Sequence, residues 1–254
     1  MTAAPDRGFI SDSLVVKLVI IIPKTPSKKI DRTAVSAFLS KTKAIRSVAQ
    51  RQPRLVFALD ATASREPTWQ QARGLHQDMF RAAQTDSHLA IQLCYFRGFN
   101  EFQYSPWLTS SDELLAHMEA VSCLGGATQI TRLLQHYLGV ATPMTPVRGL
   151  VFIGDAVEEP SQRLLDLAGQ CRVRHQPLFL FQEGNDHTVA ALFEQMAGLS
   201  GGVYARFNHH SADYLKELLG AVVRYAQGGR RALTSSGRES DKLLLMQLPR
   251  KPTN

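Results

Sequence analysis

The sequence predicts an α/β fold in which a doubly wound, mostly parallel sheet has helices on both faces and one antiparallel edge strand. Three observations predict it. Apolar runs alternate with amphipathic segments along residues 53–227, as expected when strands and helices alternate. Several of the apolar runs are continuous, without the polar alternation of a sheet that has one solvated face. The turn around Gly98 is too short for a crossover helix, so the two strands that it joins should be antiparallel.

Strands are predicted from apolar runs that lie between turn residues. Most of these runs show no polar alternation, and the others are short and rich in aromatic residues. In chain order they are RLVFALD (54–60), HLAIQLCYFRG (88–98), NEFQYS (100–105), VRGLVFIGD (147–155), QPLFLFQ (176–182) and GGVYARF (201–207). Helices are predicted where apolar residues recur every three to four positions, often behind a capping residue. In chain order they are PTWQQARGLHQDMFRAAQ (67–84), SSDELLAHMEAV (110–121), TQITRLLQHYLGVA (128–141), SQRLLDLAGQCR (161–172), TVAALFEQMAGLS (188–200) and SADYLKELLGAVVRYAQ (211–227).

Residues 53–227 form the predicted main domain. Outside it, composition divides the chain into three further parts. Residues 1–13 read as a disordered N-terminus. Residues 14–50 read as a strand and a helix, which form either an extra layer on the main domain or a docking arm. Glycine, serine and basic residues dominate 228–254, which predicts a basic, flexible tail. Its one apolar island, KLLLMQL (242–248), is either a docking motif for another chain or a segment that folds back.

Composition narrows the class of protein. The chain has 254 residues, 44% hydrophobic and 20% charged, which is a globular balance. The net charge of +7 comes from the two ends, since no lysine occurs between Lys43 and Lys216. No nucleic-acid motif accompanies the charge, so nucleic-acid binding is not expected. The apolar run at 14–22 is too short for a membrane span and contains Lys17. Sparse cysteines without metal-ligand spacing favour a cytoplasmic protein.

Oxygen-bearing side chains lie in three short loops, the expected first, second and third ligand loops: DATAS, GGAT and IGDAVEE. Asp60, Thr62 and Ser64 alternate directly after a buried strand, Thr128 precedes a helix, and Asp155 ends another strand. In an extended segment, alternate residues point the same way, and ligands of such sheets bind beyond the carboxyl ends of the strands. Carboxylate and hydroxyl oxygens are suitable ligands for Mg²⁺, and also for Ca²⁺ and Mn²⁺. The set contains no histidine or cysteine, the ligands that zinc favours. The sequence therefore predicts a hard-cation site on this edge.

These motifs make the main domain resemble a von Willebrand factor A (VWA) domain, the fold of integrin I domains. The metal-ion-dependent adhesion site (MIDAS) of that family is written DxSxS, then a threonine, then an aspartate. DATAS (60–64), the threonine of LGGATQI and the aspartate of FIGDA follow that order. The resemblance implies that Thr62 and Ser64 bind the cation directly and Thr128 directly or through water. It implies that Asp60 and Asp155 act mostly through coordinated water, and that a partner's Asp or Glu completes the site.

Some neighbouring residues depart from the pattern or leave alternatives open. Thr62 replaces the usual first serine but keeps the hydroxyl, and Ala156 replaces a glycine that often follows the last aspartate. The pair Gly125–Gly126 is expected to let the backbone pass close to the ion. The pair Glu158–Glu159 either tunes the ion or consists of solvated loop charges.

Three functions are compatible with these motifs. The first is a cation-dependent protein-interaction module or adaptor without enzymatic activity, whose partner, by analogy with intracellular family members, could be a AAA+ ATPase. The second is a haloacid-dehalogenase-like phosphatase with Asp60 as nucleophile. Against it, Thr62 stands where that chemistry wants a second carboxylate, and no lysine lies between Thr128 and Asp155. The third is a structural assembly subunit whose metal site is not essential.

Overall fold

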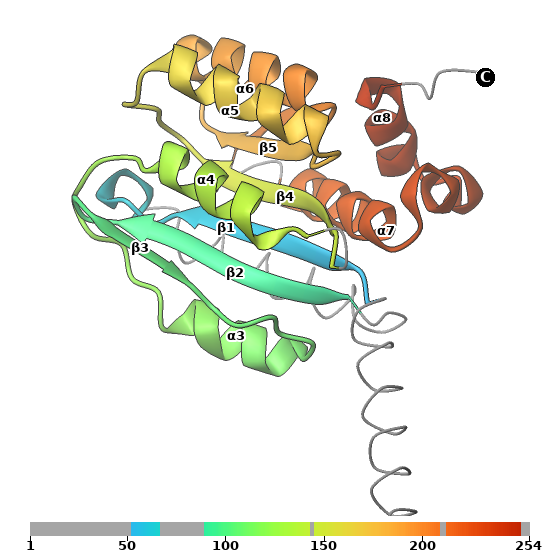
Figure 1. Ribbon diagram of the computed structural model, residues 1–254, viewed down its shortest axis with the longest axis horizontal. Helices are drawn as coiled ribbons and strands as arrows, with labels where there is room; N and C mark the ends of the chain where they lie inside the picture. Colours follow the sequence, from blue (N-terminus) through green and yellow to red (C-terminus); the bar gives the residue numbers. More distant parts are fainter. Residues whose placement is uncertain (1–51, 67–88, 143–144, 209–211, 250–254) are drawn as a thin grey trace, which may run out of the picture. The chain divides into compact units, whose positions relative to one another are not determined.

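One six-stranded sheet forms the centre of the fold. The structure, a computed structural model, describes residues 52–66, 89–142, 145–208 and 212–249. The strand order is β3-β2-β1-β4-β5-β6 (Figure 1). The strands are β1 (Arg54–Asp60), β2 (Ala90–Arg97), β3 (Glu101–Tyr104), β4 (Val147–Gly154), β5 (Leu178–Glu183) and β6 (Val203–Phe207). β2 and β3 pair antiparallel and the other neighbours pair parallel, which confirms the predicted sheet.

The helices of the described residues are α3 (Ser111–Glu119), α4 (Ile130–Val140), α5 (Ser161–Val173), α6 (His187–Ser200), α7 (Ala212–Ser236) and α8 (Glu239–Gln247), together with a 3₁₀ turn, η1 (Ala63–Arg65). The helices α3 to α6 lie close to those predicted, α7 extends beyond the predicted 211–227, and α8 was not predicted. Ser110 caps α3, because its side chain accepts a hydrogen bond from the Glu113 amide. The expected N-terminal segments, 1–13 and 14–50, and the expected helix at 67–84 lie outside the described residues.

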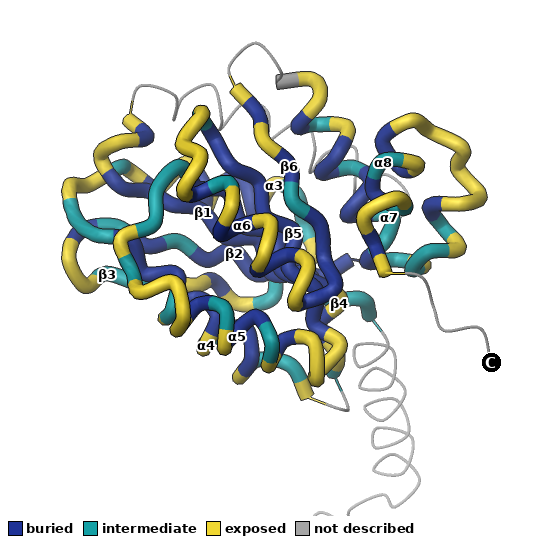
Figure 2. The backbone as a smooth tube through the Cα atoms, turned by 90° about the horizontal axis from the view of Figure 1, so that it is seen from above, coloured by how far each residue is buried: buried dark blue, intermediate teal, exposed yellow. Residues whose placement is uncertain are grey.

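Helices cover both faces of the sheet, and β1 has apolar side chains on each. Leu55, Phe57 and Leu59 pack with α3, α7 and α8, whereas Val56 and Ala58 pack with α4, α5 and α6. Figure 1 shows α4, α5 and α6 together on one side of the sheet and α3 on the other. In Figure 2 the central strands are almost continuously dark blue. Burial on both faces explains why these strands show no polar alternation.

The chain changes direction across the sheet between β1 and β4. β1 pairs with β2 on one side and with β4 on the other. From β2 the chain continues outward to β3, and from β4 it continues to β5 and β6. In such sheets this switch point leaves a crevice beyond the carboxyl ends of the two strands. Asp60 ends β1 and Asp155 directly follows β4, so both lie at this switch point.

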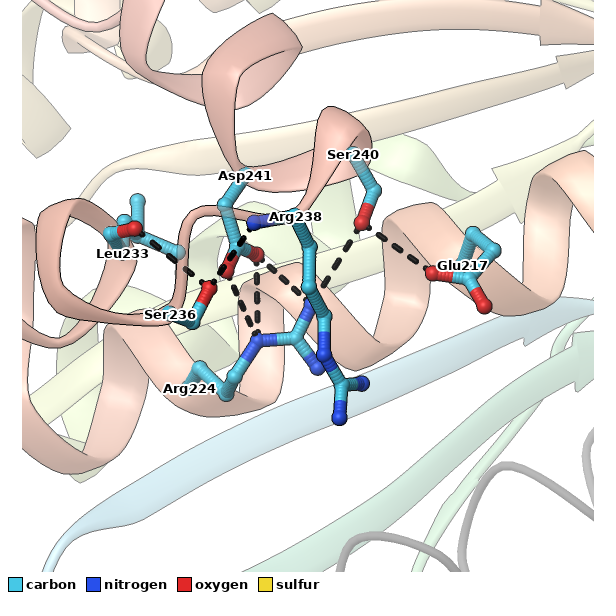
Figure 3. Close-up of polar contacts among 7 residues, drawn as sticks. All are labelled: Glu217, Arg224, Leu233, Ser236, Arg238, Ser240 and Asp241. Atoms are coloured by element: carbon cyan, nitrogen blue, oxygen red, sulfur yellow. Dashed lines mark hydrogen bonds and ion pairs between the residues drawn. The ribbon is translucent and has the colours of Figure 1, made fainter.

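Residues 228–249 are folded, which corrects the flexible tail expected for that part of 228–254. α7 breaks at Gly229 (φ 63°, ψ −154°) and continues to Ser236, and α8 then folds back against it. Asp241 on α8 is 0% exposed and pairs with Arg224 on α7 at 2.6 Å (Figure 3). Three leucines from this segment enter the core with α7: Leu233, Leu244 and Leu248. The KLLLMQL island therefore folds back on its own domain.

α8 also reaches the last strand of the sheet. The backbone amide of Tyr204 on β6 donates a hydrogen bond to Oε1 of Gln247 at 3.1 Å. β6 is an edge strand, so this amide faces away from β5 and would otherwise meet solvent. Within the described residues, each helix is too short or too polar to span a lipid bilayer.

Candidate metal centre

Asp60 forms the base of the site. Its side chain is buried, and its Oδ1 accepts hydrogen bonds from the Thr62 amide at 2.8 Å and the Thr62 hydroxyl at 2.6 Å. Its Oδ2 is equally enclosed but accepts no hydrogen bond from any described residue. A buried acceptor without a donor is costly, because it has lost water and gained nothing in return. The arrangement leaves one carboxylate oxygen available for a cation or a cation-bound water.

A second carboxylate oxygen in the same state lies on the neighbouring strand end. Oδ1 of Asp155 is enclosed and likewise accepts no hydrogen bond within the described part of the chain. The two carboxylates are near enough to interact electrostatically. Burial raises the pKa of Asp60 to about 6, the Thr62 hydrogen bonds oppose this rise, and the charge of Asp155 adds to it. Two unsatisfied acceptors of like charge at one switch point are what a bound divalent cation would stabilise.

The hydroxyls of Thr62 and Ser64 lie 3.1 Å apart. Because Thr62 donates its proton to Asp60, Ser64 is the donor in that contact, and lone pairs remain on both oxygens. The backbone conformation that brings these two hydroxyls together is not the extended one that was expected. Residues from Ala63 onward turn into η1, so the backbone turn, and not strand alternation, brings Ser64 to Thr62.

Thr128 is joined to the loop of Asp155 by a reciprocal pair of hydrogen bonds. The Thr128 amide donates to Oε2 of Glu158, and the Glu158 amide donates to the Thr128 hydroxyl, each at 3.0 Å. The carboxylate of Glu159 accepts from the amides of Ile130 and Thr131, both at 2.6 Å. Gln129, at the N-cap of α4, makes no side-chain cap. Glu158, although exposed, and the half-buried Glu159 therefore bind the loop of Asp155 to the start of α4 through hydrogen bonds to its first amides.

The glycine pair before Thr128 has a different close neighbour from the one expected. A Cβ on Gly126 would overlap the carbonyl of Gly98 in the β2–β3 turn. The amide of Ala127 donates to that same carbonyl at 3.2 Å. A Cβ on Gly125 would meet nothing closer than 4.0 Å. Gly126 thus allows the loop to lie against the β2–β3 turn, and this contact positions the approach to Thr128.

Arg65 is a positioning residue that the sequence analysis did not identify. Its guanidinium is buried and pairs with Glu183 on β5 at 2.7 Å. It also donates to the carbonyl of Ile153 on β4 at 3.1 Å and to that of Asp60 at 3.4 Å. Arg65 therefore connects the end of the first ligand loop to three strands. A single arginine after DATAS gives no local signal of this, because its partner carboxylate lies 118 residues further on.

The donor set consists of oxygens only. Hydroxyls come from Thr62, Ser64 and Thr128, and carboxylates from Asp60 and Asp155. No cluster of three or more His, Cys, Asp or Glu side chains with metal-binding geometry occurs among the described residues. If neutral hydroxyls made the direct contacts and the two carboxylates acted through water, as the resemblance implies, no negative charge would touch a divalent ion directly. An incoming carboxylate from another molecule could then bind to it.

Comparisons with known proteins agree on the fold. No protein-family model matches the chain, and no curated protein matches it in sequence. Among solved structures, a von Willebrand factor type A protein from Catenulispora acidiphila is 12% identical with a TM-score of 0.55, over 68% of this chain and 43% of that one. The SpRpn10 VWA domain is 12% identical with a TM-score of 0.52, over 68% of this chain and 94% of that one.

A third solved structure carries a metal. Proximal thread matrix protein 1 from the mussel byssus, with a zinc-occupied MIDAS motif, is 15% identical with a TM-score of 0.53, over 67% of this chain and 44% of that one. At such identities the likeness concerns the fold alone. The described part of the chain thus has the α/β fold of VWA domains, as the resemblance predicts.

Proposed function

We propose that this chain is a cation-dependent protein-interaction module that binds an acidic residue of a partner through a metal ion. The observation that best supports this proposal is a pair of enclosed carboxylate oxygens at the switch point, one on Asp60 and one on Asp155. Neither accepts a hydrogen bond from the described residues. Thr62, Ser64 and Thr128 would complete the protein's share of the ligands. The bound cation would supply the charge that attracts a carboxylate. A partner's Asp or Glu would occupy the remaining position.

Mg²⁺ is the proposed cation, and Ca²⁺ and Mn²⁺ are compatible with the same oxygens. The zinc in the mussel protein belongs to that structure; here no histidine or cysteine is among the five proposed ligands. The partner is proposed to be a protein, and a AAA+ ATPase in the cytoplasm is one candidate by family analogy. No enzymatic activity is proposed, because the motifs of the candidate metal centre fix no general base for water among the described residues.

The phosphatase interpretation gains no support from the geometry. Oδ1 of Asp60 is engaged by Thr62, and the residue two positions on carries a hydroxyl where a second carboxylate is wanted. The basic side chain nearest in sequence, Arg65, is buried in its pair with Glu183. It is therefore not free to bind a phosphate.

Isothermal titration with Mg²⁺ tests the site. Wild type should bind one Mg²⁺, and both Asp60→Ala and Asp155→Ala should lose that binding. Asp166→Ala, which removes an exposed carboxylate from α5, should bind like wild type. Equal binding by the wild type and Asp60→Ala would overturn the metal site.

The chelator dependence of partner binding separates the adaptor from a structural subunit. A partner captured in Mg²⁺ and released by EDTA fits the proposed module. A partner retained fully in EDTA would favour the structural subunit with a non-essential metal.

A further inference from the structure

Two large apolar side chains are exposed on the loops beside the metal centre. Phe99, in the β2–β3 turn, is 87% exposed, the highest value among the large apolar side chains of the described residues. Leu124, in the loop that leads to Thr128, is 52% exposed. Single exposed apolar residues are common on proteins and need no explanation. Two such residues on adjoining loops beside a candidate binding site do call for an explanation.

Backbone hydrogen bonds tie both loops to the first ligand loop. The Leu124 amide donates to the Ala61 carbonyl at 3.0 Å, and Leu124 forms a parallel bridge with Thr62. Bridged strands lie about 5 Å apart, so the backbone of Leu124 is next to that of a proposed ligand. The Gly98 amide in turn donates to the Leu124 carbonyl at 3.3 Å. Phe99, Leu124 and the ligand loop therefore belong to one connected rim.

The conformation of the turn keeps these side chains outside the core. Gly98 adopts φ 59°, which reverses the chain directly before Phe99. The side chain of Leu124 lies over Gly98, where an added Cβ would come within 3.2 Å of its Cδ2. Burying either side chain would favour folding by about 1.5–3 kcal/mol. Phe99 contributes little of this stabilisation, and Leu124 contributes only part of it.

The charged groups Arg97, Glu101 and Arg132 around the turn already have ion-pair or hydrogen-bond partners within the loop cluster. Arg97 pairs with Glu101 at 2.9 Å and donates to the carbonyl and hydroxyl of Ser122. Arg132 donates to the carbonyl and side-chain oxygens of Asn100 at 3.1 and 3.0 Å. These groups are occupied within the loop cluster, so the apolar side chains are what the rim offers to a partner beside the cation.

We propose that Phe99 and Leu124 form the apolar part of the partner-binding surface, and that the partner segment carries a large apolar residue within two positions of its acidic residue. This proposal rests on the proposed function, since the acidic residue must be bound by the cation. The carboxylate would give the attachment, and the apolar residue beside it would bury Phe99 and Leu124. Desolvated aromatic and aliphatic contacts of this kind dominate the affinity of many interfaces.

A displayed peptide library provides the probe. Its members have a central Asp or Glu with randomised flanks, and the immobilised full-length chain selects them in Mg²⁺. Sequences with Leu, Ile, Met, Phe, Tyr or Trp within two positions of the central acid should be enriched. The enriched peptides should bind the double variant Phe99→Ser/Leu124→Ser at least tenfold more weakly than wild type. Mg²⁺ affinity, measured by calorimetry, should stay within twofold.

A matched control and the possible outcomes complete the test. Val173 and Met246 are 81% and 77% exposed on α5 and α8, and Val173→Ser/Met246→Ser should bind the peptides like wild type. Mg²⁺-dependent binding that the Phe99/Leu124 variant leaves intact, or enrichment without an apolar preference, would overturn the surface and leave the proposed function supported. Binding that persists in EDTA but is lost in that variant would contradict the cation-dependent function and support the surface. Failure to enrich any sequence would contradict both.

Discussion

Replacing Asp60 with asparagine should change how the stability of the metal-free protein depends on pH. Burial raises the pKa of this carboxyl from 3.8 to about 6, so the folded chain holds the proton more tightly than the unfolded chain does. The contribution of Asp60 to stability is then fully present below about pH 4. It is lost as the pH rises to about 6, where the folded carboxyl ionises. Asp60→Asn keeps an oxygen for the two Thr62 hydrogen bonds and cannot ionise.

The size of the effect follows from those two pKa values. Each pH unit between 3.8 and about 6 is equivalent to about 1.4 kcal/mol. The wild type should therefore lose about 3 kcal/mol relative to Asp60→Asn between pH 4 and pH 7.5. The new amide hydrogens cost about 1–3 kcal/mol at all pH values if they find no acceptor. This cost moves the two curves apart by a constant and leaves their relative slope unchanged.

Urea unfolding at equilibrium in EDTA, from pH 4 to pH 8, measures the difference. Asp166→Asn, an exposed carboxylate on α5, should show no comparable change in slope relative to wild type. At pH 7.5, Mg²⁺ at 100 times its dissociation constant should restore about 2.7 kcal/mol to wild type and nothing to Asp60→Asn. A stability difference between wild type and Asp60→Asn that is independent of pH would refute the reasoning. It would mean that Asp60 is already satisfied in the metal-free protein.

Three further predictions concern the supports of the site and the last helix. Glu159→Gln removes a charged cap from α4 and should lower the free energy of unfolding by about 1 kcal/mol and weaken Mg²⁺ binding about fivefold; no change in titration or urea melts would contradict it. Gly126→Ala should destabilise by about 2 kcal/mol, whereas Gly125→Ala should stay within about 0.5 kcal/mol; equal melting temperatures would be the contrary result. Arg224→Ala strands the buried Asp241 and should cost about 3 kcal/mol with faster hydrogen exchange in α8, and unchanged exchange there would argue against it.

The strands and the proposed ligands could be predicted because their signals are local. A strand buried on both faces reads as an unbroken apolar run, and RLVFALD and VRGLVFIGD each show where the run ends. Parallel strands place those ends on one edge whatever the details of the loops. Asp60 and Asp155 were therefore predicted to share that edge from the order of elements alone.

The supports of the site could not be predicted because their partners are distant in sequence. Glu158 and Glu159 bind amides that lie 28 to 30 residues earlier, and Arg65 finds Glu183 from 118 residues away. In sequence these are ordinary loop charges. The fold of the tail could not be predicted from composition for a similar reason. In sequence Asp241 is an ordinary polar residue, and only the folded chain brings it to Arg224 on α7.

The hydrogen bond from the β6 amide to Gln247 places α8 over part of a sheet edge. An uncovered edge strand is a template on which a second chain can add a strand, and such pairing leads to aggregation. α8 lies against that edge and occupies one of its outward amides. A chain shortened to residue 227 would keep every proposed metal ligand yet leave the sheet open at β6. α8 therefore covers part of the β6 edge, and every proposed metal ligand precedes it by more than eighty positions.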